Sequence, residues 1–258
     1  MNRLRSVYVL LICVQFLMIT SCRQQTKSKV TITVATASNM QFAMKEIAEA
    51  FTSQSGIECE LIVGSSGKLT AQITEGAPYD VFVSADIKYP NELYKIGRII
   101  GQPKIYARGK LVLWTMAEGL SPELNSLTSV NIKHIAIANP KNAPYGKAAI
   151  EVLQRNGLLD SVKHKLVYGE SISQTNQFII SRSAELGFTA MAVVQSTEMK
   201  NKGKWMNIST DHYSPIDQGV VVIKRDENHL AQSSAFVDFL FSDKAVKILE
   251  NFGYSTSE

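Results

Sequence analysis

Four short polar turns, each directly before a predicted helix, are the segments of this chain best suited to hold a ligand. They are Ser38-Asn39, Ser65-Ser66-Gly67, Pro144-Tyr145-Gly146 and Ser171-Ile172-Ser173. Serine and asparagine are favoured at helix N-termini, and glycine lets the backbone come close to a ligand. The first turn of a helix offers unpaired N–H groups and partial positive charge, which suit a buried anion without any cationic side chain. Capping alone explains any one such turn, but four of them, two from each half of the chain, favour a shared anion site.

Predicted strands and helices alternate along the body of the chain. Apolar patterns predict strands at residues 30–35, 60–63, 80–84, 110–114, 134–138, 166–168, 187–190 and 218–223. Helical apolar spacing predicts helices at residues 40–51, 68–75, 145–156, 172–183, 235–241 and 244–252, with another through Leu93 and Ile96. This alternation indicates an α/β fold with mostly parallel strands, whose ligands bind where strands end and helices begin.

Two of the predicted strands are placed to run between two lobes. Residues 110–114 would leave the first lobe and residues 218–223 would return to it. The first lobe is then expected to comprise residues 30–112 and 218–258, and the second lobe residues 113–217. We expect the last two helices to pack back on the first lobe, and a cleft between the lobes to close about the connecting strands as a hinge.

The first 29 residues have the features of an export signal followed by a tether. Arg3 and Arg5 precede an apolar run at residues 7–19, which has the length of a signal-peptide core and is too short to span a bilayer. The following Ile19-Thr20-Ser21-Cys22 resembles the lipobox of bacterial lipoproteins, in which cleavage before the cysteine leaves that residue lipid-modified. We predict a lipoprotein signal peptide at residues 1–21 and a flexible tether at residues 22–29. An ordinary secretory signal with an incidental cysteine is the alternative.

Charge and cysteine content narrow the function classes. Loss of residues 1–21 removes two of the 27 basic residues and no acid, which leaves 25 basic against 23 acidic side chains. This near balance, without a basic block, argues against a nucleic-acid partner. With Cys13 in the signal and Cys22 lipidated, Cys59 is alone, so no intrachain disulfide is expected. Cys59 alternates with polar positions and is interpreted as a small buried hydrophobe.

Five motifs resemble the periplasmic molybdate-binding proteins of ABC importers. They are VGSSGKL at residues 63–69, GAPYDVFVSAD at 76–86, ARGKLVLW at 107–114, NPKNAPYG at 139–146 and ELGFTA at 185–190. The resemblance extends from Val30 to about Gly253. It implies a two-lobed type II periplasmic-binding-protein fold with two mixed sheets joined by two crossing strands. It also implies a receptor that binds a tetrahedral oxyanion, molybdate or tungstate, and is not an enzyme.

The resemblance also implies which residues hold the ion. In the family the oxyanion is bound by the first turn, by the second serine of the Ser-Ser turn and by two backbone amides. These positions correspond here to Ser38 and Asn39, to Ser66, and to the amides of Tyr145 and Ile172.

One branch of the family has a serine at the position of Asn39 and a tyrosine at the position of Ala190, so we assign no contact to Ala190. The partners implied are an ABC permease and its ATPase, with membrane contact through the lipid on Cys22. A monomer is expected, with no cofactor besides the bound ion.

Other ligands of the same fold remain alternatives. Molybdate, tungstate and sulfate carry no proton at neutral pH, so they suit a site made only of donors, whereas hydrogen phosphate also needs an acceptor. Asp86 and Glu170 adjoin two of the turns, so phosphate stays open. We expect Asp86 to cap the helix at Lys88 and Glu170 to point away. An organic anion is a further alternative, and ferric iron is disfavoured because the turns lack clusters of tyrosine and carboxylate.

A catalytic lipoprotein is the alternative of a different class. Ser65-Ser66-Gly67-Lys68 matches the S-x-x-K pattern of penicillin-recognising enzymes, but no Ser-Asp-Asn or Lys-Thr-Gly accompanies it. Gly67-Lys68-Leu69 is not a phosphate-binding P-loop, because no Ser or Thr follows the lysine. The four histidines (His134, His164, His212 and His229) are scattered without metal-ligand spacing. No nucleophile–base pair is therefore visible in the sequence.

The lipobox makes a direct prediction. Cys22→Ala should leave the precursor uncleaved by the lipoprotein signal peptidase and without lipid, because the cysteine is both the cleavage marker and the acyl acceptor. Labelling with a radioactive or alkynyl fatty acid measures the result. A lipid anchor would be contradicted if the wild-type protein took up no label and were recovered with the soluble proteins after cell fractionation.

Overall fold

The computed structural model describes residues 30–225 and 229–256. The predicted signal peptide, the tether and Cys22 lie outside these residues. Within them, no helix is both long enough and apolar enough to cross a membrane.

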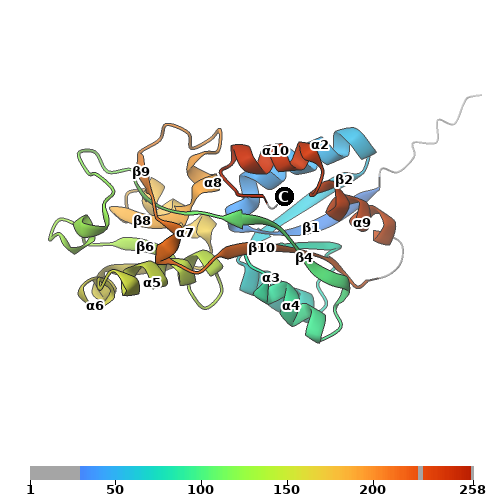
Figure 1. Ribbon diagram of the computed structural model, residues 1–258, viewed down its shortest axis with the longest axis horizontal. Coiled ribbons are helices and arrows are strands. Elements are labelled where there is room, and N and C mark those ends of the chain that lie inside the picture. The colour runs from blue at the N-terminus through green and yellow to red at the C-terminus, as the bar shows by residue number, and fades with distance from the viewer. Residues whose placement is uncertain (1–29, 226–228, 257–258) are drawn as a thin grey trace, which may run out of the picture.

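Two five-stranded mixed sheets form the body of the protein, side by side along its long axis (Figure 1). The first sheet has the order β2-β1-β3-β10-β4, in which β1 lies parallel to β2 and β3 while β10 is antiparallel to β3 and β4. Its strands are β1 (Thr31–Ala37), β2 (Glu58–Gly64), β3 (Val81–Ser84), β4 (Ile99–Gly109) and β10 (Ile216–Ile223).

The second sheet has the order β7-β6-β8-β5-β9, with β6 parallel to β7 and β8, and β5 antiparallel to β8 and β9. Its strands are β5 (Leu111–Thr115), β6 (Ile135–Ala138), β7 (Leu166–Gly169), β8 (Leu186–Ala190) and β9 (Lys204–Asn207). The expected α/β class with two mixed sheets is confirmed.

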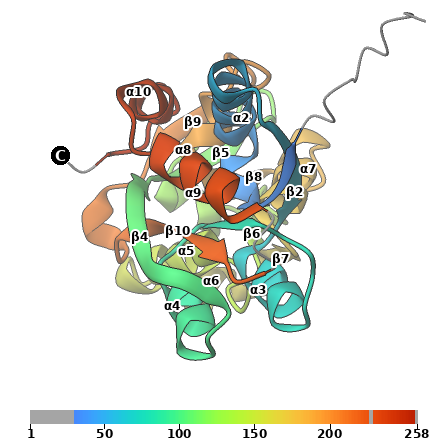
Figure 2. The same cartoon turned by 90° about the vertical axis from the view of Figure 1, so that its right-hand side faces the viewer.

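Helices cover both faces of the first sheet, as the end-on view shows (Figure 2). They are α2 (Gln41–Ser55), α9 (Leu230–Phe239) and α10 (Asp243–Asn251) on one face, and α3 (Ser66–Thr74) and α4 (Lys88–Lys95) on the other. Strand residues alternate between the two cores, so Val81 and Val83 pack under α2 while Phe82 between them packs under α3 and α4. The expected packing of the last two helices on the first lobe is confirmed.

The second lobe carries α5 (Pro144–Arg155), α6 (Leu159–Val162), α7 (Ile172–Ile180) and α8 (Met191–Val194). The described residues also form the short 3-10 helices η1 (Ser38–Met40), η2 (Leu124–Thr128), η3 (Lys163–Lys165) and η4 (Thr210–His212). The largest side chain of this lobe's core, Trp114, is fully buried and donates its indole N–H to the Lys202 carbonyl at 3.0 Å.

The chain changes sheets at Lys110, which separates β4 from β5, and again just before β10 begins at Ile216. Both changes come slightly before the predicted lobe boundaries at residues 113 and 218. The long strand at the first crossing is therefore β4, which the sequence analysis missed. Gly101, Gln102 and Pro103 interrupt its apolar pattern, and as an edge strand it is largely exposed, so no period-two signal survives.

Two further differences have similar causes. The four residues of β9 form an edge strand that is mostly exposed, so they lack alternation. Helix α9 begins at Leu230, whereas the sequence pattern predicted a start at residue 235. The earlier start was missed because the polar Gln232, Ser233 and Ser234 interrupt the apolar spacing of its first turns.

Cys59 lies on β2 and is partly buried. Burial raises the pKa of its thiol to about 12, while a hydrogen bond with Thr52 acts in the opposite direction. The group therefore stays protonated near neutral pH, which agrees with its interpretation as a packing residue.

Candidate anion-binding site

All five residues assigned to the ion by resemblance line one cavity between the lobes. Ser38, Asn39, Ser66, Tyr145 and Ile172 are each at most 3% exposed, and Ala37, Ser65, Ala85, Ala143 and Pro144 complete the lining. The cavity has a volume of about 10 Å³. Pockets for organic ligands usually have roughly 300–1,000 Å³. The space is therefore far smaller than is usual for an organic ligand.

Four helix N-termini meet at this cavity, each at the end of a parallel strand. Strand β1 leads into η1, β2 into α3, β6 into α5 and β7 into α7. The register aligns Ala37 with Gly64 at the ends of β1 and β2, and Ala138 with Gly169 at the ends of β6 and β7. The two helix starts of each lobe are therefore neighbours. The first N–H groups of a helix have no partner within it, so they are available to a ligand.

Local sequence explains why these helices begin where they do. The Ser65 and Ser171 side chains accept hydrogen bonds from the Lys68 and Gln174 amides, both at 3.4 Å, and so cap α3 and α7. Pro144 occupies the first turn of α5, where its missing N–H costs no hydrogen bond.

The two serines of the site differ in their hydroxyl groups. The Ser66 oxygen accepts a hydrogen bond from the Ala85 amide at 2.9 Å, so its own hydrogen is free to donate into the cavity. The Ser38 hydroxyl instead donates to the Gly64 carbonyl at 2.9 Å. Ser66 is thus the side-chain donor of the site, whereas Ser38 offers its backbone.

The side-chain amide of Asn39 forms hydrogen bonds within the protein. Its Nδ2 donates to Gln218 Oε1 at 2.8 Å and to Tyr254 Oη at 3.0 Å, which uses both amide hydrogens. What Asn39 can present to the cavity is therefore its backbone N–H, at the start of η1. Gln218 and Tyr254 were not identified as site residues from the sequence, because they lie 179 and 215 positions from Asn39.

Tyr145 is buried, at 1% exposure, and its hydroxyl lies against Gly109, where any side chain would collide with it. Burial raises the pKa of this hydroxyl well above its ordinary value. The hydroxyl end of the ring is thus turned to the segment between the lobes, and the amide at the start of α5 is the group of Tyr145 available to a ligand.

Among the described residues, the cavity lining includes no charged side chain. The Glu170 carboxylate is half exposed and pairs with Lys68 Nζ at 2.9 Å. Asp86 accepts from the Tyr89 amide at 3.2 Å in the first turn of α4, as expected of a capping residue, and burial raises its pKa. Neither of these carboxylates, nor Ala190, belongs to the lining. Within residues 30–225 and 229–256, no three His, Cys, Asp or Glu side chains lie close enough together to hold a metal ion.

Contacts between the lobes close the cavity. The Gly67 amide donates to the Asn142 carbonyl at 2.9 Å, and the Tyr89 hydroxyl donates to the Lys141 carbonyl at 3.1 Å. Ser173 Oγ donates to Gln41 Oε1 at 2.7 Å on another side. Two of these contacts depend on main-chain groups, so closure is specified by backbone approach more than by side-chain type.

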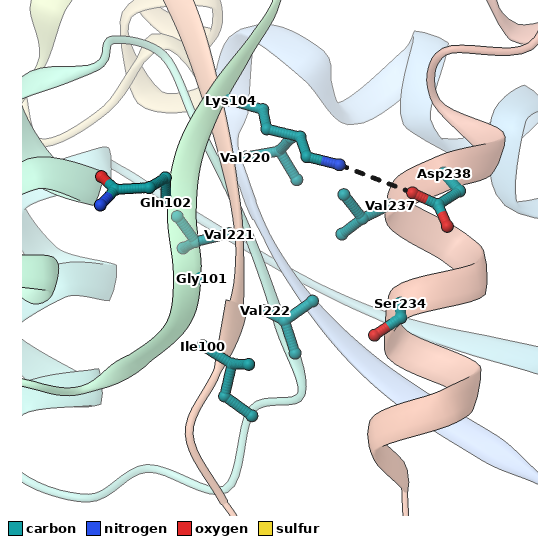
Figure 3. Close-up of a pocket in the computed structure, with 10 residues that line it drawn as sticks. All are labelled: Ile100, Gly101, Gln102, Lys104, Val220, Val221, Val222, Ser234, Val237 and Asp238. Atoms are coloured by element: carbon teal, nitrogen blue, oxygen red, sulfur yellow. Dashed lines mark ion pairs between the residues drawn. The ribbon is translucent and has the colours of Figure 1, made fainter.

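A more open hollow lies within the first lobe, between β4, β10 and α9 (Figure 3). Val220, Val222 and Val237 point into it, and the Lys104–Asp238 ion pair, at 3.6 Å, spans its upper end. The charge of Lys104 is already paired and the remaining walls are largely aliphatic. This hollow lacks the convergent donors of the interlobe cavity.

Comparison with known proteins agrees with this geometry. Residues 32–255 match the family described as "Bacterial extracellular solute-binding protein". The chain is 39% identical over 225 residues to the molybdate-binding protein ModA of Azotobacter vinelandii, which covers 86% of this chain and 89% of that protein. It is 28% identical to the putative ABC transporter substrate-binding lipoprotein YvgL of Bacillus subtilis, over 93% and 94% of the two chains. Among solved structures, the periplasmic molybdate-binding protein of A. vinelandii superposes with a TM-score of 0.83 at 36% identity, over 88% of this chain and 100% of that one.

The close approach at Gly67 predicts a closure defect. A Cβ on this residue would lie 2.9 Å from Asn142 Cα and 2.9 Å from the Tyr89 hydroxyl, so Gly67→Ala should oppose closure by about 1–3 kcal/mol. With a tetrahedral oxyanion present, small-angle scattering should give the variant a larger radius of gyration than the wild type. Thr74→Ala, at an exposed position of the same helix, is the control. Equal radii for Gly67→Ala and wild type would show that the lobes close without this contact.

Proposed function

The chain belongs to the bacterial extracellular solute-binding proteins, and on that premise we propose that it binds molybdate or tungstate in the interlobe cavity and delivers the ion to an ABC permease. The ion is cargo, so the protein needs no other cofactor and carries out no chemical reaction. Delivery takes place outside the cytoplasm, where this family works.

The observation that carries this proposal is the lining of the cavity, which offers hydrogen-bond donors and apolar surface. Among the described residues, the lining has no carboxylate and no cationic side chain. A fully ionised tetrahedral oxyanion has only acceptor oxygens, and the helix-start amides and the Ser66 hydroxyl at this cavity are hydrogen-bond donors that suit it. The four helix starts add partial positive charge without a counter-ion, each contributing roughly 0.3–1 kcal/mol. Hydrogen phosphate is less well suited, because its proton would find no carboxylate in the lining to accept it.

Within the donor-only class, size separates the candidates. Molybdate and tungstate are larger than sulfate, so a rigid cage built for the larger ions would leave sulfate with stretched hydrogen bonds. The relative at 39% identity is named as a molybdate-binding protein, and it supports the larger ions. Sulfate remains the second candidate, and the selectivity measurement below distinguishes the two.

The proposal includes a location and partners. We infer that lipid on Cys22 anchors the chain at the outer face of a membrane, and the relative named as a substrate-binding lipoprotein supports this. A monomer would deliver the ion to a permease that is driven by its ATPase. These points rest on the lipobox and on the family, since the anchor itself lies outside the described residues.

Ser66 gives the sharpest test of the site. A hydrogen bond to a charged group contributes about 1.5–3 kcal/mol, so Ser66→Ala should weaken molybdate binding roughly tenfold to a hundredfold. Isothermal titration calorimetry measures the change. Ser181→Ala, whose exposed hydroxyl bonds to its own helix, is the matched control and should bind as the wild type does. An unchanged Kd for Ser66→Ala would remove the main side-chain donor from the site.

Ligand selectivity tests the identity of the cargo. A ligand at about 100 times its Kd stabilises the folded state by about 2.7 kcal/mol, which for a chain of this size raises Tm by roughly 5–10 °C. We expect this rise with molybdate and with tungstate at micromolar to sub-millimolar concentration, and little or none with sulfate or phosphate. Differential scanning fluorimetry provides the measurement. An equal rise with sulfate would make the protein a general oxyanion receptor, and no rise with any of the four would exclude them all.

A further inference from the structure

Behind the first turn of the site, Asn39 is held from two directions. Tyr254 Oη accepts from Asn39 Nδ2 at 3.0 Å and donates to the backbone carbonyl of Asn39 at 3.1 Å. It therefore holds both the side chain and the backbone of this residue. Gln218 Oε1 accepts the second amide hydrogen at 2.8 Å. All three side chains are almost completely buried, at 4% exposure or less. The orientation of η1, and with it the direction of its first N–H groups, is therefore determined by this cluster.

Gln218 also reaches the second turn of the same lobe. Its Nε2 donates to the Ala85 carbonyl at 3.1 Å and to the Ile216 carbonyl at 3.2 Å, and the Ala85 amide in turn donates to Ser66 Oγ. A continuous chain of hydrogen bonds thus runs from Asn39 through Gln218 and Ala85 to Ser66. Both side-chain hydrogens and the oxygen of Gln218 are satisfied, as a buried amide requires.

The two residues come from segments that are distant from the turns in sequence. Gln218 lies on β10, the strand that begins as the chain returns to the first lobe. Tyr254 lies in the C-terminal segment, which is attached to β4 through paired hydrogen bonds between Arg108 and Ser255, at 2.7 and 3.0 Å. Neither Gln218 nor Tyr254 lines the cavity. Any effect on the ion must therefore be indirect, and hydrogen bonds lead from these two residues to Asn39 and, through Ala85, to Ser66.

We propose that Gln218 and Tyr254 are positioning residues of the anion site, which orient the donors of Asn39 and Ser66 and thereby set both affinity and ion selectivity. The inference rests on the proposed oxyanion binding and adds a second layer to it. A cage discriminates between ions of different size only if its donors cannot move to follow the smaller one. Loosening the second layer should therefore weaken binding of the larger ion and reduce its advantage over the smaller one.

The test uses Gln218→Met, which removes the amide from a side chain of similar length, and Tyr254→Phe, which removes one hydroxyl. Tyr106→Phe is the matched control, because its hydroxyl is buried close to that of Tyr254 yet has no hydrogen-bond partner among the described residues. Calorimetry on the full mature chain gives the Kd values for molybdate and sulfate. We expect each positioning variant to weaken molybdate binding about threefold to tenfold and to lower the sulfate-to-molybdate Kd ratio. Tyr106→Phe should change neither.

A double-mutant cycle separates positioning from general stability. Because Gln218 acts partly through Asn39, the combined Gln218→Met and Asn39→Ala variant should lose clearly less affinity than the product of the two single losses. Independent, multiplicative losses would overturn the proposal. A lower Tm with unchanged Kd values and unchanged ion ratio would also overturn it, since that pattern marks a purely structural role.

Failure of the proposed function gives a different result. A wild-type chain that binds neither molybdate nor sulfate refutes the function, and the positioning role with it, before any variant is compared. If Gln218→Met does not fold, Tyr254→Phe decides the outcome alone, because the change is confined to one oxygen atom. Wild-type affinity and selectivity in Tyr254→Phe would then refute the role.

Discussion

A buried anion without a buried counter-charge requires hydrogen-bond donors on every side, and this requirement accounts for the two-lobed arrangement. Removing a charge from water is costly unless hydrogen bonds replace the lost hydration. One helix start supplies only a few N–H groups, all from one direction. Each lobe here contributes two helix starts, from neighbouring parallel strands whose ends are in register. Only the two lobes together surround the cavity.

Closure is what gives these donors their strength. When the lobes exclude water, the effective dielectric constant falls and each N–H interacts more strongly with the ion. The contacts that hold the lobes together are mainly neutral hydrogen bonds, such as that from the Gly67 amide to the Asn142 carbonyl. The Lys68–Glu170 pair at the surface is half exposed, so it is expected to contribute at most about 1 kcal/mol. Backbone complementarity at the cleft thus has more weight than surface charge.

The connecting segments serve more than one purpose. The chain passes between the lobes at the end of β4 and just before β10, and these two strands carry Gln218 and anchor the segment that bears Tyr254. The segments next to the lobe crossings therefore also form the back of the site.

The sequence by itself determined the features that depend on local order. Alternating strand and helix patterns predicted an α/β fold, and the Ser, Asn and Gly turns marked where helices begin, because capping and periodicity are properties of neighbouring residues. The resemblance then selected five positions that the structure brings to one cavity. Edge strands β4 and β9 were missed, since an exposed edge needs no apolar alternation.

Only the tertiary structure decided what each polar group can do. Ser38 and Ser66 look equivalent in sequence, yet their hydroxyl groups differ. The Ser38 hydroxyl donates to the Gly64 carbonyl, whereas the Ser66 oxygen accepts from the Ala85 amide and keeps its own hydrogen available. The assignment of Asn39 to the site did not say which of its groups would face the ion, and partners 179 and 215 positions away occupy both hydrogens of its side-chain amide. A hydroxyl or amide has few hydrogens, and whether they face a ligand depends on acceptors brought close by folding. No local pattern records those acceptors.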